Sequence, residues 1–142
     1  MSKCCNKPLI KRLLISMILG IGFGLLCAYL ASTKDPSIWD TSSPVFWSIV
    51  YNRFLIGVVI GIAGFMTKHP MFNFKIPAWL RGAKIGAIVS VAMAIDTLMI
   101  PDTPSSELWK LFWMTILAGA IYGLIIDVVA SKFGGQGKEL LD

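Results

Sequence analysis

The sequence predicts an all-α integral membrane protein, an antiparallel bundle of four transmembrane helices joined by short loops. Three observations predict this class. The 142 residues are 56% hydrophobic and only 15% charged, with a mean hydropathy of +0.72, whereas a soluble domain of this length carries more charge. Four apolar segments each approach the ~20 residues that cross a bilayer as a helix. Each of these segments also contains a Gly-x-x-x-Gly pair.

The four apolar segments cover about 13–32, 45–67, 82–100 and 108–131. Lipid offers no hydrogen-bond partners, so a spanning segment is either a helix or a barrel strand. These segments are long and do not alternate strictly, which favours helices. The loops before the second and fourth segments are rich in Asp, Ser, Thr and Pro, which end one helix and start the next. Such short loops place consecutive helices antiparallel, so we expect a single membrane domain over 1–142.

The connection 68–81, between the second and third segments, differs from the other loops. Pro70 and Pro77 interrupt it, and its apolar and aromatic side chains alternate with basic ones. This mixture favours the headgroup zone, where rings meet acyl chains and cations meet phosphates. We therefore expect an interfacial segment on the cytoplasmic surface, with a plain anchored turn as the alternative. Its lipid contacts would be Lys68, Phe72, Phe74, Lys75, Trp79 and Arg81.

The net charge of +5 is distributed unevenly along the chain. Ten of the 13 Lys and Arg residues lie near the two termini or around 68–81, and the opposite side holds only Lys34 and Lys110 beside acidic residues. Short-loop Lys and Arg stay in the cytoplasm, so we predict that both termini are cytoplasmic, in the plasma membrane. The basic face lies next to the membrane, which favours anionic lipids as partners and argues against nucleic acid.

The glycine pairs predict close contacts between helices. Residues four apart share one face of a helix, and a face stripped of side chains lets a neighbouring backbone approach closely. Such faces are typical of helix–helix seams, and the alternative is that they line a narrow pathway. The pairs are Gly20 and Gly24, Gly57 and Gly61, Gly82 and Gly86, and Gly119 and Gly123.

Besides Lys110 at the edge of the fourth segment, four charged residues, Arg53, Lys84, Asp96 and Asp127, lie within the apolar segments. A charge at a helix centre costs ~2.5–3.5 kcal/mol on insertion scales, so each is a functional candidate. Their depths predict one ion pair in each leaflet, Arg53 with Asp96 and Lys84 with Asp127. Asn52 adds a hydrogen-bonding group beside Arg53. Alternatively, the shallower residues reach interfacial water by snorkelling.

Signals for an enzyme are missing from the sequence. His69 is the only histidine, and no group of His, Cys and Asp has the spacing of metal ligands. The glycines lie inside apolar helices rather than after a strand, so they do not form a phosphate-binding loop. We expect neither catalysis nor a metal or cofactor.

The sequence leaves three functions open. The leading one is a packing or interaction subunit, or an assembly factor, that forms homo-oligomers or binds membrane-protein partners through small-residue helix faces. The second is a minimal oligomeric channel or transporter for a small anionic solute, which would use Asn52, Arg53, Asp96 and Asp127. The third is an anionic-lipid-binding protein that acts through the segment 68–81.

Overall fold

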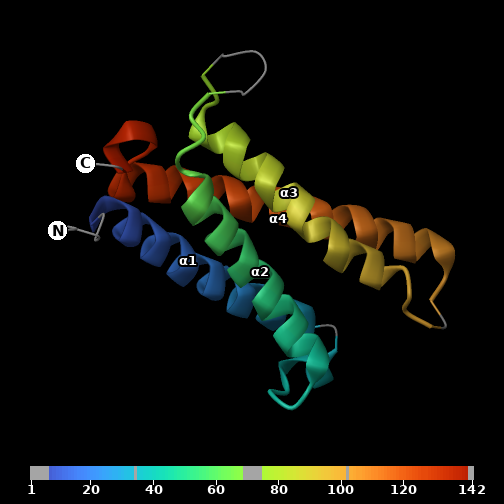
Figure 1. Cartoon of the computed structure of the whole chain (residues 1–142). Coiled ribbons are helices and arrows are strands. Elements are labelled where there is room, and N and C mark those ends of the chain that lie inside the picture. The colour runs from blue at the N-terminus through green and yellow to red at the C-terminus, as the bar shows by residue number, and fades with distance from the viewer. Residues whose placement is uncertain (1–6, 34, 69–74, 102, 141–142) are drawn as a thin grey trace.

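The computed structural model describes residues 7–33, 35–68, 75–101 and 103–140, and four long α-helices dominate this part of the chain (Figure 1). Each helix is long and apolar enough to cross a membrane. The predicted all-helical class is confirmed, and the four helices fit an integral membrane protein. They are α1 (Lys7–Ser32), α2 (Pro44–Ala63), α3 (Ala78–Thr97) and α4 (Ser105–Gly134).

The helices do not coincide with the apolar segments. α1 has 26 residues and begins at Lys7, and α4 has 30 residues and ends at Gly134. At ~1.5 Å per residue these helices are ~39 and ~45 Å long, while α2 and α3 are ~30 Å. Backbone hydrogen bonds continue through polar residues at a helix end, so hydropathy marks only the part of a helix that suits lipid.

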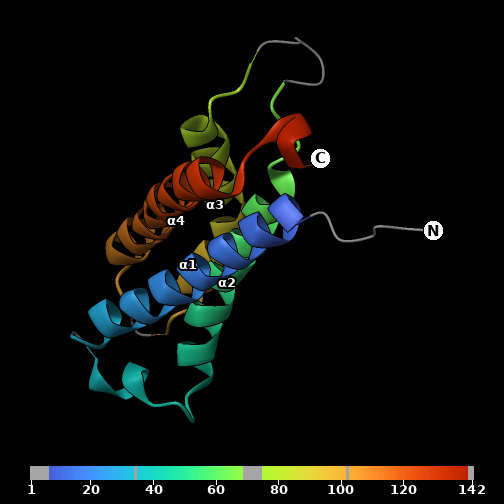
Figure 2. The same cartoon turned by 90° about the vertical axis from the view of Figure 1, so that its left-hand side faces the viewer.

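The helices form two antiparallel hairpins, α1 with α2 and α3 with α4. Contacts are extensive within each hairpin and fewer between the two. In Figure 1 the hairpins diverge from the end of the molecule where the termini lie. Figures 1 and 2 agree that both termini and the α2–α3 connection share this end, with the other two connections at the opposite end.

The α1–α2 connection is shaped by two aspartates. Asp35 precedes the short 3₁₀ helix η1 (Pro36–Trp39), and its carboxylate accepts the Ser37 hydroxyl at 2.7 Å and the Ser37 N–H at 3.0 Å. Asp40 accepts the hydroxyl and N–H of Ser42 at 2.7 and 2.9 Å. These hydrogen bonds favour the charged carboxylates, so they lower the pKa of Asp35 and of Asp40 below the ordinary aspartate value.

The C-terminal segment folds back onto the bundle. Gly135 and Gly137 have positive φ values of 81° and 64°, a backbone region that glycine adopts without steric cost. The chain then enters the short helix η2 (Gly137–Leu140), whose Leu140 is fully buried. The N–H of Gly137 donates to the carbonyl of Gly64 at 2.9 Å, which ties this segment to the end of α2.

Candidate functional site

The eight glycines of the four pairs are all buried, and each lies at a contact within one hairpin. In the α3–α4 hairpin, a Cβ built on Gly86 would collide with the carbonyl oxygen of Gly119. In the α1–α2 hairpin, a Cβ on Gly57 would collide with the carbonyl oxygen of Ser16. These small-residue faces are occupied inside the chain, so a partner protein would have to contact other surfaces.

A buried ion-pair cluster lies near the basic end of the bundle. Asp127 of α4 is fully buried, and its Oδ1 accepts hydrogen bonds from Arg12 Nη2 at 2.5 Å and from Arg81 Nη2 at 2.9 Å. Its Oδ2 accepts from Arg81 Nε at 2.8 Å. Arg81 therefore holds the carboxylate in the bidentate geometry that makes such pairs strong. We call Arg12, Arg81 and Asp127 the inner cluster.

The inner cluster also reaches α2 and the segments beyond the helices. Arg12, on α1, donates to the carbonyls of Ile60 and Gly61 on α2 at 3.2 and 3.3 Å, and to the carbonyl of Gly135 at 2.8 Å. Arg81, on α3, donates to the carbonyl of Met66 at 3.0 Å. All four helices are thus joined by two guanidinium groups and one carboxylate. The formal charge of the inner cluster is +1.

A second buried cluster surrounds Arg53, which is 1% exposed. Arg53 Nη1 donates to Asn52 Oδ1 at 3.0 Å and to the Ser90 hydroxyl at 2.8 Å. Its Nη2 lies 3.9 Å from the Cys27 sulfur, and the guanidinium lies over the ring of Tyr122, 5.3 Å from the ring centre. These groups come from all four helices. We call these five residues the Arg53 cluster.

The Arg53 cluster contains no carboxylate. Among the described residues, the partners of Arg53 are an amide, a hydroxyl, a thiol and an aromatic ring, and its Nε has no hydrogen-bond partner. Dipoles and the ring face stabilise the guanidinium charge only in part. Asn52 in turn donates from Nδ2 to the carbonyl of Val89 at 3.2 Å. The Arg53 cluster therefore holds an uncompensated positive charge.

The predicted Arg53–Asp96 pair does not form. Asp96 is exposed, and the ion pairs of the described residues do not include it. The buried face of α3 includes Ser90 and Ala94. Asp96 follows Ala94 by two residues, which rotates it by ~200° around the helix axis. Depth in the membrane suggested this pair, but Asp96 lies on the opposite side of α3.

The predicted Lys84–Asp127 pair is also wrong, for the same reason. Lys84 is exposed and follows the buried Gly82 by two residues, so it too is rotated by ~200° away from α4. The arginines of the inner cluster take its place as the partners of Asp127.

Both arginines of the inner cluster were missed by the sequence predictions. Arg81 was expected at the lipid interface, but it is only 4% exposed and bound to Asp127. Arg12 looked like an ordinary flanking cation. A signal was present, because Arg12 lies four residues before Ser16, which continues at the same spacing into the first glycine pair. That spacing places Arg12 on the buried face of α1.

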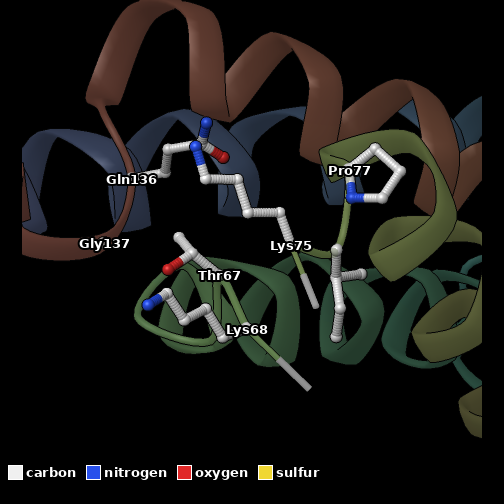
Figure 3. Close-up of a pocket in the computed structure, with 7 residues that line it drawn as sticks. Thr67, Lys68, Lys75, Pro77, Gln136 and Gly137 are labelled. Carbon is white, nitrogen blue, oxygen red and sulfur yellow. The ribbon is translucent and has the colours of Figure 1, made fainter. Parts of the chain in front are cut away.

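Two of the other predicted lipid contacts, Lys68 and Lys75, line a hollow at the basic end (Figure 3). Lys68, Lys75 and Trp79 are exposed, while Phe72 and Phe74 fall outside the described residues. The hollow, which we call the loop pocket, has a volume of about 490 Å³. The described residues that line it are Thr67, Lys68, Lys75, Ile76, Pro77, Gln136 and Gly137.

Within the described residues, no three His, Cys, Asp or Glu side chains are grouped so that they could hold a metal ion. The buried carboxylate of Asp127 is already engaged by two arginines. No known protein-family model matches the chain, and comparisons with curated proteins and with solved structures give no significant match.

Proposed function

We propose that this chain is a small polytopic membrane protein that acts through contacts with other membrane components, as an interaction subunit or assembly factor. The observation that carries this proposal is which groups the buried charged side chains bond to. Each buried charged side chain of the described residues bonds to other helices of the same chain. Side chains used in this way stabilise an architecture, which supports a structural role more than a monomeric conduit.

The partner surface would lie on the outward faces of the helices, because the glycine faces are occupied within the hairpins. Large apolar side chains cover these outward faces, among them Ile18 on α1, Ile88 on α3 and Leu117 on α4. Lipid covers such faces by default. A partner helix can replace lipid there through close packing and interhelical hydrogen bonds.

We also propose that both termini are cytoplasmic and that the host membrane is the plasma membrane. The end that carries the termini also carries the α2–α3 connection (Figures 1 and 2). Exposed lysines are concentrated near the termini and the α2–α3 connection, which supports a cytoplasmic location for this end by the positive-inside rule. They are Lys7, Lys11, Lys68, Lys75, Lys84 and Lys132.

Site-specific photocrosslinking tests the interaction proposal. A photoreactive amino acid is placed singly at Ile18, Ile88 and Leu117, which are 67%, 71% and 61% exposed. Each variant is irradiated in its native membrane and, after purification, in liposomes. We expect a discrete protein adduct from one helix face, and an adduct in liposomes identifies a second copy of the chain. Only lipid adducts at every position, or equal adducts at all three, would contradict the proposal.

An oligomeric pathway for an anionic solute is the second candidate, and the charge balance of the interior favours it. The buried charged groups of the described residues are Arg12, Arg53, Arg81 and Asp127, so the formal buried charge is +2. A positive interior attracts anions. The test is chloride and phosphate flux in liposomes with Arg53→Met as the control variant. Anion flux that is lost in a folded Arg53→Met protein would favour this candidate over the first.

A further inference from the structure

The loop pocket is a preformed site that neither buried cluster uses. The two arms of the α2–α3 connection meet there with a segment distant in the sequence, the chain after α4. Lys68 and Lys75 form an antiparallel β-bridge, and the Ile76 N–H donates to the Thr67 carbonyl at 2.9 Å. The Gly137 N–H donates to the Gly64 carbonyl. Backbone hydrogen bonds therefore fix the walls of the pocket.

The polar groups that line the pocket are suited to an oxyanion. Lys68 and Lys75 supply two ammonium groups, Thr67 a hydroxyl and Gln136 an amide. Figure 3 shows the side chain of Lys75 extending toward Gln136, with Thr67 beside Lys68. Among the described residues that line the pocket, none carries a carboxylate. Charged donors make the strongest hydrogen bonds to phosphate and carboxylate oxygens.

The volume of the loop pocket and its apolar lining residues restrict the kinds of ligand that it could bind. A volume of about 490 Å³ lies within the range of sites for small molecules and exceeds the space that a single halide needs. Ile76 and Pro77 add apolar surface to the lining, and the exposed Trp79 follows in the first turn of α3. Tryptophan favours the membrane–water interface, so the pocket would open at the depth of lipid headgroups.

We propose that the loop pocket binds a phosphate group, either on an anionic lipid headgroup or as free phosphate. The ammonium groups of Lys68 and Lys75 hold the phosphate oxygens, and the Thr67 hydroxyl adds an uncharged hydrogen bond. This site is separate from the outward helix faces of the proposed interaction function, so either proposal can fail without the other.

Ligand titration of the full chain in dodecyl maltoside, followed by amide NMR, tests the proposal. The probes are a short-chain phosphatidic acid, inorganic phosphate and, as the zwitterionic control, a short-chain phosphatidylcholine. The test variant is Lys68→Gln/Lys75→Gln. The matched control, Lys11→Gln/Lys84→Gln, removes the same charge from exposed lysines at the same end that do not line the pocket. High salt screens the long-range attraction that all these lysines share.

We expect saturable shifts of the Thr67, Lys75 and Gly137 amides with phosphatidic acid. A lysine near an anionic group contributes about fivefold in affinity, so the test variant should bind about 25-fold more weakly, and the control variant should bind as the wild type does. Thr67→Val removes the hydroxyl without changing the charge and should weaken binding by about threefold. Unchanged amide shifts elsewhere in the bundle establish that each variant is folded.

The probes distinguish the two sources of phosphate. Saturable binding of phosphatidic acid alone supports a lipid headgroup, while comparable binding of inorganic phosphate supports the phosphate group itself. Three results would overturn the proposal: no saturable binding of either compound, equal weakening in the test and control variants, or phosphatidylcholine bound as tightly as phosphatidic acid.

Discussion

At the scale of single residues, Asp127 is a buried carboxylate on which two buried arginines depend for their counter-charge. It supplies the only carboxylate of the inner cluster, where it contacts Arg12 and Arg81. A buried ion pair contributes little net stability compared with apolar packing, but removing one partner leaves a buried charge uncompensated. Asp127 is shared by two cations, so its loss is more costly than the loss of either arginine.

Asp127→Asn should destabilise the folded protein by about 3–5 kcal/mol, because both guanidinium groups lose their counter-charge. Asp96→Asn makes the same chemical change on the exposed side of α3 and should alter the unfolding free energy by less than about 0.5 kcal/mol. Reversible unfolding in mixed detergent micelles measures both values. Equal effects in the two variants would argue against the inner cluster.

Arg53→Leu and Asp96→Leu provide a second test at the residue scale. Asp96 does not contact the Arg53 cluster. The changes in unfolding free energy caused by the two substitutions should therefore add, within about 0.5 kcal/mol, to the change in the double variant. The measurement is a double-mutant cycle in the same micelles. A larger coupling energy would restore the ion pair that depth alone had suggested.

Some of these residues could be identified from the sequence and others could not. Arg53 lies four residues before Gly57 and eight before Gly61, a spacing that puts its charge on the glycine face of the helix, and the structure buries it. The partners of Arg53 depend on the rotation of each helix about its axis, which neither hydropathy nor depth specifies. Lys84 and Asp96 show this, since each lies two residues beyond a buried position of α3.

At the scale of helices, the hairpin seams depend on backbone-to-backbone contact. Gly86 faces the carbonyl of Gly119, where an added Cβ has no room. Gly22 lies on the exposed face of α1, and an added Cβ there would meet nothing within 4 Å. Glycine-to-alanine substitution can therefore be compared at a closely packed position and at an exposed one.

Gly86→Ala should push α3 and α4 apart and destabilise the protein by about 1–3 kcal/mol, as overpacking does in other tightly packed interfaces. Gly22→Ala should cause no loss of stability, because alanine favours a helix over glycine. Thermal unfolding in detergent compares the two variants. A Gly86→Ala protein as stable as the wild type would contradict the α3–α4 seam described here.

The glycine spacing was visible in the sequence, and short loops favoured antiparallel neighbours. The angle between the two hairpins was not predictable, because it depends on how side chains of different lengths fit between them. The return of the C-terminal segment was also missed. It depends on Gly135 and Gly137, whose left-handed backbone conformations have no hydropathy signature.

At the scale of the whole molecule, the termini and the α2–α3 connection share one end (Figure 2). Single cysteines test how this end lies in the membrane, in a chain whose three native cysteines are replaced by serine. Ser37→Cys and Thr103→Cys should react with a membrane-impermeant reagent from the face opposite to Gln136→Cys. Labelling of all three positions from the same face would contradict a four-span topology.

The unequal helix lengths have a consequence for the surrounding bilayer. α2 and α3, at 20 residues each, match a hydrocarbon thickness of ~30 Å, and so does the apolar part of α1, 13–32. The apolar part of α4, 108–131, is ~36 Å long and exceeds it. Hydrophobic mismatch is relieved by tilt or by local deformation of the lipid, at a cost of a fraction of a kcal/mol per Å. The other three helices therefore set a preferred thickness while α4 tilts, and membranes that differ in sterol content, and so in thickness, should accommodate this protein unequally.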